Sequence, residues 1–353
     1  MVLEKSPLSP YGYWQESESI PIVTGLTVDE VGLIEVSEWA RKGVKGAFIK
    51  LDGAEETLDS YVCEIPNGGK TNPEKYMFEE AIFVLSGRGA TTVWQENGKE
   101  HTFEWQKGSV FSPPINSWRQ HFNGSGQEPA RFIAFTNAPL VMNIFRSEQF
   151  IFNNNFIFSE RFGDEEDYFS KGGDGNFNEY HNRIRREVNY IPDIYNFLLE
   201  DQWDQAAFMA VQMAQNTLQS HVAELPVGTY MTAHRHGPGA HIIVLKGTGY
   251  SLFWENTEEK KMVYWKPNTL MSPPDMVFHQ HFVTSKEPAR HLAFHFGGWR
   301  VMFKHLFRHS TGINNGGHKI LYHEESPEIL DIFSKELNKN GMKPKSIEEW
   351  RKS

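Results

Sequence analysis

The sequence contains very little cysteine and no long hydrophobic run. Its 353 residues include one cysteine, Cys63, which excludes an internal disulfide and a cysteine-based zinc site. A small buried side chain is the simplest interpretation of this thiol, and its isolation suits a reducing compartment. There is no apolar stretch of membrane-spanning length and no charged-then-apolar leader pattern. These absences predict a soluble, cytoplasmic protein with no membrane partner.

Basic residues are also in the minority. Lys and Arg number 35 against 45 Asp and Glu, which gives a formal net charge of −10, and no basic block stands out. This balance argues against nucleic acid or an anionic membrane as a partner. Hydrophobic residues make up 39% and aromatic residues 14% of the chain, which is enough for cores and excludes a disordered chain. The length fits two domains of ordinary size.

An internal repeat defines the domain organisation. Ala47-Phe-Ile matches Ala207-Phe-Met, and Ser112-Pro-Pro matches Ser272-Pro-Pro, both at an offset of 160 positions. Each copy consists of short alternating apolar runs separated by Gly, Pro, Asn and Asp, which is typical of an antiparallel barrel or jelly roll. The predicted fold class is therefore all-β, with two tandem jelly-roll barrels and short flanking helices.

The repeat divides the chain into five parts. An N-terminal arm precedes the first module, a segment rich in Phe, Asn and Gly joins the modules, and a tail follows the second. The predicted boundaries are 1–45, 46–146, 147–205, 206–310 and 311–353. We expect a short amphipathic helix around Val28–Lys42. In the tail we expect a helix from Ser326, because serine, proline and glutamate form a typical helix start.

The best functional signal lies between positions 228 and 247. His234 and His236 share one face of an extended segment there, because side chains in a strand alternate with a period of two. His241 follows a Gly-Pro-Gly turn, and His279 lies behind the Ser-Pro-Pro of the same module. Imidazoles gathered in this way are ligands for a divalent metal, and three protein ligands leave positions open for substrate. We therefore predict one divalent metal ion per chain.

Further candidate residues surround the predicted metal ligands. His241 is expected to be a fourth ligand or, alternatively, a group that supports the ligands or faces substrate. His281 has a counterpart, His121, in a module that lacks the other histidines, so we expect His281 to support the ligands or the structure. His295 and Tyr250 are candidates to face substrate, with core packing as the alternative.

The first module lacks the histidine set. At the offset of 160, the positions of His234, His236, His241 and His279 carry Glu74, Tyr76, Ala81 and Arg119. We predict that the side chains of Glu74 and Arg119 converge as an ion pair in a degenerate, metal-free barrel. Glu79 and Glu80 are expected at the surface, with the alternative that one of them faces inward.

At these histidines and the glycines and prolines around them, the sequence resembles the cupin superfamily, and the doubled module resembles a bicupin. The first cupin motif extends from Gly228 to Gly247, and the second from Pro274 to His279. The stretch Ala-His-Arg-His-Gly-Pro-Gly-Ala that begins at Ala233 is similar to the motif of gentisate-type ring-cleaving dioxygenases, which hold Fe(II) by three histidines. In that family the metal set lies in the first module, whereas here it lies in the second.

The resemblance implies a metal-dependent enzyme. We expect an Fe(II) dioxygenase that acts on a small anionic aromatic or enolisable substrate, although Mn(II), Ni(II) or Zn(II) would suit the same imidazoles. The alternative is a Mn- or Zn-dependent redox-neutral lyase, isomerase or hydrolase, and a second alternative is a non-enzymatic binding or storage bicupin. We also expect a homodimer or larger homo-oligomer, with the aromatic arm packed across a module or a partner chain.

Overall fold

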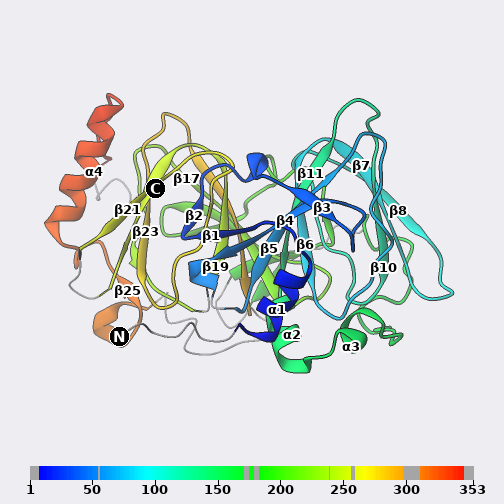
Figure 1. Ribbon diagram of the computed structural model, residues 1–353. Coiled ribbons are helices and arrows are strands. Elements are labelled where there is room, and N and C mark those ends of the chain that lie inside the picture. Colours follow the sequence, from blue (N-terminus) through cyan, green and yellow to red (C-terminus); the bar gives the residue numbers. More distant parts are fainter. Residues whose placement is uncertain are drawn as a thin grey trace.

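Figure 1 shows two β-barrels side by side, with helices at the periphery. This computed structural model describes residues 8–54, 56–170, 175–178, 183–237, 239–255, 259–297 and 311–345. The first barrel is formed mainly by residues 44–136 and the second mainly by residues 206–296. The predicted fold class of two tandem jelly-roll barrels with short flanking helices is confirmed.

The first barrel consists of two sheets that face each other. The larger sheet contains, in spatial order, β1 (Ile22–Gly25), β4 (Val44–Leu51), β5 (Asp59–Ile65), β11 (Ala130–Thr136), β6 (Glu80–Ser86), β9 (Val110–Phe111) and β14 (Tyr190–Ile191), with β3 (Ser37–Trp39) on β4. The smaller sheet contains β10 (Trp118–Asn123), β7 (Arg88–Trp94) and β8 (His101–Gln106).

The second barrel repeats this plan. Its larger sheet contains β12 (Gly175–Asn178), β13 (Arg183–Glu187), β16 (Ala206–Gln212), β17 (Leu218–Leu225), β24 (Ala289–Phe296), β19 (Ala240–Lys246), β22 (Leu270–Met271) and β2 (Thr27–Val28), with β15 (Asp201–Trp203) on β16. Its smaller sheet contains β21 (Lys261–Trp265), β20 (Gly249–Trp254), β23 (Phe278–Val283), β18 (Ala233–His234) and β25 (Lys319–Ile320).

The two modules exchange strands reciprocally. β1 runs parallel to β4 of the first barrel, but β2, which follows it, pairs with β22 of the second barrel. In the same way β13 runs parallel to β16 of the second barrel, and β14 pairs with β9 of the first. Each barrel is thus completed by the segment that precedes the other barrel, so the modules form one folding unit.

Two arginines fix the exchanged segments. Arg131 pairs with Glu64 at 2.6 Å, and Arg290, its counterpart in the repeat, pairs with Glu224 at 2.8 Å. Each guanidinium also donates hydrogen bonds to backbone carbonyls of the crossing segment, namely those of Gly32 and Ile34 for the first arginine and Ile194, Tyr195 and Phe197 for the second. The shared position of these arginines in the repeat therefore reflects a shared structural role.

One hydrophobic core spans the interface between the barrels. Phe135 of the first module stacks on Phe294 of the second, with ring centroids 4.3 Å apart. Glu79 lies beside this core and is 3% exposed. Its carboxylate pairs with Arg161 at 2.9 Å and accepts a hydrogen bond from the backbone N–H of Thr217 at 2.8 Å. The expectation that Glu79 is a surface charge is therefore wrong, because this carboxylate joins the two modules.

The N-terminal arm packs on its own chain. Helix α1 (Pro10–Ser17) begins at a serine cap, where the Ser9 hydroxyl accepts a hydrogen bond from the N–H of Gly12 at 3.1 Å. Its Tyr11 and Trp14 are buried against the first barrel. The expected helix around Val28–Lys42 does not form, because this stretch contains β2, the 3₁₀ turn η1 (Val31–Leu33) and β3. Strand pairing to the barrels satisfies its backbone instead.

The other helices cover the outside of the barrels. α2 (Ala138–Phe145) and α3 (Glu148–Phe152) follow the first barrel, and the short 3₁₀ turns η2 (Asp52–Ala54) and η4 (Ile313–Asn315) lie in connections. α4 (Pro327–Lys339) lies beside the second barrel, as Figure 1 shows at its left edge, and begins after Ser326 as predicted. None of the described helices is both long and apolar enough to cross a membrane.

Candidate metal centre

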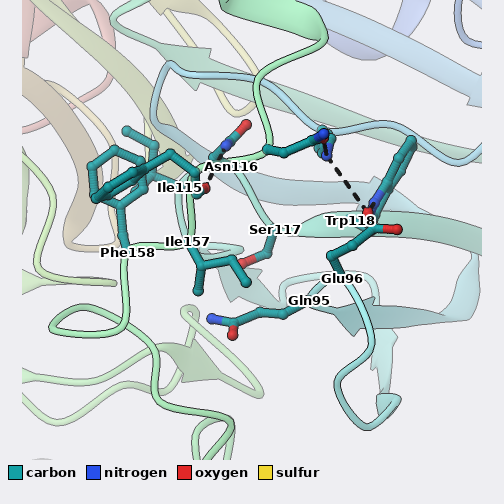
Figure 2. Close-up of a pocket in the computed structure, with 11 residues that line it drawn as sticks. Gln95, Glu96, Ile115, Asn116, Ser117, Trp118, Ile157 and Phe158 are labelled. Carbon is teal, nitrogen blue, oxygen red and sulfur yellow. Dashed lines mark hydrogen bonds and ion pairs between the residues drawn. The ribbon is translucent and has the colours of Figure 1, made fainter.

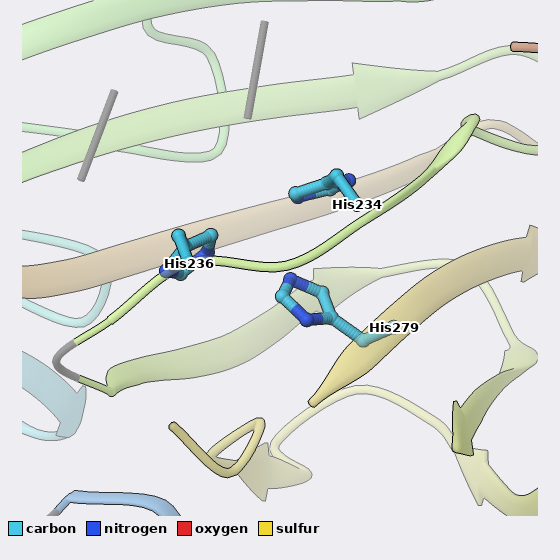
Figure 3. A group of neighbouring side chains, drawn as sticks. All are labelled: His234, His236 and His279. Atoms are coloured by element: carbon cyan, nitrogen blue, oxygen red, sulfur yellow. The ribbon is translucent and has the colours of Figure 1, made fainter. Parts of the chain in front are cut away.

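Three histidines converge inside the second barrel, on its smaller sheet and the loop that follows β18. His234 of β18 lies directly opposite His279 of β23, so the two side chains leave the sheet on the same face. His236 follows two residues after His234 and points toward the same place (Figure 3). One ring nitrogen of each lies within 4.8 Å of the others. An ion with bonds of about 2.1 Å spans this spacing after shifts of about an ångström or less.

Backbone carbonyls orient two of these imidazoles. Nδ1 of His234 lies 3.1 Å from the carbonyl oxygen of Thr232, and Nδ1 of His279 lies 3.1 Å from that of Val277. Because a carbonyl only accepts, Nδ1 carries the proton in both rings and Nε2 presents its lone pair. Burial lowers the pKa of His234, which favours the neutral form that binds metal. The donor set therefore fits a divalent first-row metal.

His241 does not join this group. Along β19, Ala240 and Ile242 belong to the core of the second barrel, whereas Ile243 belongs to the core between the modules. His241 shares the face of Ile243, and its ring lies 5.9 Å from that of Phe135. Both of its ring nitrogens are buried and have no hydrogen-bond partner among the described residues, and burial lowers its pKa to about 3. The prediction of His241 as a fourth ligand is corrected: position 240, an alanine, faces the barrel interior.

The counterpart of Ala240 in the first barrel is Glu80, which is fully buried. Its carboxylate pairs with Arg119 at 2.9 Å and accepts a hydrogen bond from the Tyr61 hydroxyl at 2.5 Å. Arg119 occupies the position of His279 and is also fully buried. The expectation of Glu80 at the surface is therefore wrong, and the alternative that it faces inward is confirmed.

The predicted side-chain pair of Glu74 and Arg119 is also wrong. The two residues exchange backbone hydrogen bonds of 3.0 and 2.9 Å, but their side chains take other partners. The carboxylate of Glu74 pairs with Lys42 at 2.5 Å, since Arg119 is engaged by Glu80. Burial alone would raise the pKa of Glu80, but the charges of Arg119 and Lys42 bring it down to about 2. Two cations and two anions thus neutralise one another inside the first barrel.

His281 belongs to a hydrogen-bond network that both barrels share. Its Nδ1 lies 2.7 Å from the hydroxyl of Ser251, just as Nδ1 of His121 lies 2.8 Å from that of Thr91. In each module a tryptophan indole also donates a hydrogen bond to that module's hydroxyl. Trp105 donates to Thr91 at 2.9 Å, and Trp265 donates to Ser251 at 3.1 Å. Burial lowers the pKa of His281 well below its usual value. Because the network also exists without the histidine group, His281 has a structural explanation.

A second group of rings lies beside the three histidines. His295 is directly opposite Ala240 across the sheet, and its ring lies 5.8 Å from that of His221. Trp203 lies 5.3 Å from the ring of His234. His295 therefore stands on the interior face, where a substrate-facing residue must be. Sequence reasoning missed His221 and Trp203, although the repeat offered a signal, since the first module has tyrosine at the position of His221.

Tyr250 lies on the opposite face of its strand. Its ring stacks on Phe282 at 4.6 Å, and Phe282 in turn packs against Phe333 of α4. The neighbouring Ser251 points inward to His281, so alternation directs Tyr250 outward. Tyr250 is therefore corrected from a substrate-facing candidate to a residue of the core beneath α4.

A shallow surface depression lies on the first module (Figure 2). Lys75 lines it, pairs with Asn155 at 2.8 Å and lies over the ring of Trp118 at 4.9 Å. The Trp118 indole donates to Glu96 at 3.0 Å. Its polar groups thus largely satisfy one another, and no imidazole lines it. The histidine group of the second barrel remains the stronger site.

Comparisons with known proteins bear on the fold. No protein-family model matches the chain, and no curated protein matches it significantly. Among solved structures, an oxalate decarboxylase variant from Bacillus subtilis is similar, with a TM-score of 0.50, 14% identity and coverage of 78% of both chains. An oxalate decarboxylase studied for its substrate binding mode has a TM-score of 0.52 and 12% identity, over 80% of this chain and 78% of the other.

A third structure, a Bacillus subtilis oxalate decarboxylase studied for its Mn(II) centres, has a TM-score of 0.51 and 13% identity. The match covers 80% of this chain and 78% of the other. At such identities the likeness establishes the fold, and the predicted bicupin architecture is confirmed. The expected likeness to gentisate-type dioxygenases finds no support in these structures.

Proposed function

We propose that this chain is a metal-dependent bicupin enzyme that catalyses a redox-neutral lyase reaction, such as a decarboxylation, on a small carboxylate. His234, His236 and His279 would hold one divalent ion, with Mn(II) as the first candidate. The observation that carries this proposal is the convergence of three imidazoles inside the second barrel. Further support comes from similar structures described as decarboxylases, one of them with Mn(II) centres.

The residues of the site favour an anionic substrate. Three neutral imidazoles and the methyl group of Ala240 leave the +2 charge of a bound ion uncompensated, so the site attracts a carboxylate. A bound divalent ion would supply Lewis acidity there. The ring of Trp203 lies 5.3 Å from that of His234, so Trp203 would border a substrate bound at the ion. In this proposal the first barrel is a scaffold, because its buried charges are already paired.

Redox-neutral chemistry replaces the expected Fe(II) dioxygenase as the leading hypothesis. Imidazole ligands do not select iron over manganese, so the donor set alone favours neither. The similar structures add weight to manganese and to decarboxylation. The Fe(II) dioxygenase gains no support from them, and the alternative of a Mn-dependent lyase fits better.

The test begins with metal analysis of protein purified without added metal. The protein is then loaded with Mn(II), Fe(II) or Zn(II) and assayed with oxalate, malonate and small 2-oxo acids, while carbon dioxide and oxygen are followed together. We expect one metal per chain, product release with Mn(II), and no net oxygen consumption. The variant His236→Ala removes one proposed ligand and should lose the metal and the activity. Tyr76→Phe, at the matching position of the first barrel, is its control and should keep both.

Two outcomes would contradict the proposal. Oxygen consumed in proportion to substrate would establish a dioxygenase instead. Tight carboxylate binding without turnover by any metal form would establish a binding protein.

A further inference from the structure

Lys319 stands in the same cross-strand row as two of the proposed metal ligands. β25 pairs with β18, and Lys319 lies directly opposite His234, which in turn lies opposite His279. Directly opposed residues of antiparallel strands share a face, with Cβ atoms about 4.5–5.5 Å apart. The side chain of Lys319 therefore leaves the sheet on the face of the histidines. It is supplied by the segment after the second module, far from the histidines in sequence.

Asp204 holds this lysine in place. One of its carboxylate oxygens pairs with the Lys319 ammonium, and the other accepts a hydrogen bond from the hydroxyl of Thr232. The lysine and aspartate side chains are 11% and 10% exposed. Thr232 also supplies the carbonyl that orients His234. The Asp204 carboxylate is thus fixed through both oxygens, next to the proposed metal ligand.

The ammonium of Lys319 keeps unused hydrogen-bonding capacity. An ammonium has three N–H donors, and within the described part of the chain Asp204 is the one acceptor that Lys319 contacts. Lys42 of the first barrel differs, because it pairs with Glu74 and lies 4.7–5.6 Å from three aromatic ring centroids. No such ring lies against Lys319 among the described residues. Leaving donors of a largely buried cation without acceptors is costly, which points to an anionic ligand.

We propose that Lys319 binds the second anionic group of a dianionic substrate whose first carboxylate lies at the metal. This inference rests on the proposed function, since the metal would hold the first group. It narrows the substrate class to small dicarboxylates, because a monocarboxylate held at the metal offers no second acceptor to the Lys319 ammonium, which already pairs with Asp204. Lys319 acts by binding and orienting, and no covalent step is assigned to it.

The test measures anion binding rather than turnover. Full-length protein loaded with Mn(II) is titrated with malonate and with acetate, and binding is followed by calorimetry and by the Mn(II) spin-resonance spectrum. We expect malonate to bind at least tenfold more tightly than acetate, and Lys319→Met to lose that preference while keeping its Mn(II). Lys319→Arg, the charge-conserving control, should retain most of it. Unchanged malonate affinity in Lys319→Met with Mn(II) bound would overturn the proposal.

A second variant covers the case in which Lys319→Met fails to fold with Asp204 unpaired. The double variant Lys319→Gln, Asp204→Asn keeps a hydrogen-bonding pair and removes both charges. Malonate preference retained in it would also overturn the proposal. The outcomes separate the two inferences. If Lys319→Met loses the preference for malonate but the wild type turns over no carboxylate, the proposed reaction is wrong and the binding role of Lys319 stands. If Lys319→Met turns over dicarboxylates as well as the wild type does, the binding role of Lys319 is wrong and the proposed reaction stands.

Discussion

The two barrels use the same four interior positions for different chemistry. In the second barrel, positions 234, 236, 240 and 279 carry three imidazoles and a methyl group. In the first barrel, positions 74, 76, 80 and 119 carry two carboxylates, a phenol and a guanidinium. Strand order and the hydroxyl–histidine–tryptophan network are nearly the same in both. The difference therefore lies in side chains on a conserved frame.

The comparison shows two different sets of polar groups at matching positions inside a barrel. Polar groups inside a barrel must find partners, because burying them without partners is costly. The first barrel solves the problem within the chain, since Arg119 pairs with Glu80 and Lys42 with Glu74. The second barrel presents imidazole lone pairs that a metal ion would satisfy. The salt-bridge network of the first barrel and the ion proposed for the second would thus be alternative solutions to one electrostatic problem.

The largest expected effect comes from breaking the salt bridge of the first barrel. Glu80→Ala leaves the buried guanidinium of Arg119 without its partner. We expect a loss of about 3–5 kcal/mol in the free energy of unfolding, measured by urea denaturation. The double variant Glu80→Leu, Arg119→Met should recover most of this loss, because it removes both charges. A loss below about 1 kcal/mol, as for exposed pairs, would show that the barrel interior is wet.

The free energy of unfolding should depend on pH through Asp59 of the first module, whose matching residue in the second module is the uncharged Gln219. Burial raises the pKa of Asp59 to about 7, although Ser60 and Tyr11 donate hydrogen bonds to it. Because the folded pKa exceeds the unfolded value, the folded state binds more protons, and stability falls as pH rises from about 4 to 7.

Asp59→Asn removes this dependence. Relative to the variant, the wild type should lose on the order of 3 kcal/mol between pH 4 and pH 8. Urea denaturation of both proteins across this range measures the difference, in which contributions from other groups cancel. A parallel pH dependence in the two proteins would show that Asp59 is ionised in the folded state.

Metal-linked stability should belong to the second barrel alone. An ion that binds only the folded state stabilises by about 2.7 kcal/mol at a free concentration of 100 Kd. We expect Mn(II) to raise the melting temperature of the wild type and of Tyr76→Phe, but not of His236→Ala. Full metal retention in His236→Ala, by elemental analysis, would remove this residue from the ligand set.

The smallest effect is expected at His241, which lies in the core between the modules. His241→Leu removes two buried nitrogens that have no hydrogen-bond partner in the part of the chain that the structure describes. We expect a gain of about 1 kcal/mol in the free energy of unfolding and unchanged metal content. The repeat supports an apolar residue here, since the matching position is Ala81. Loss of metal in this variant would restore His241 as a ligand.

The plan of the molecule could be predicted from local patterns in the sequence. The repeat at an offset of 160, with alternating apolar runs, was enough to predict two tandem β-barrels. The pair His234 and His236, with His279 behind a double proline, was enough to predict which side chains meet. These features are readable because they depend on local periodicity and on spacing within one module.

Which neighbouring residues face the site could be seen only in the folded chain. A shift of one residue moves a side chain to the other face of a strand, so spacing could not distinguish His241 from Ala240. For the same reason, spacing predicted Glu74 as the partner of Arg119, whereas the structure shows Glu80. The position of Lys319 could not be predicted for a different reason. The pairing of β25 with β18 brings this residue from the C-terminal segment to His234. Register depends on hydrogen bonds between distant strands, and no local pattern encodes it.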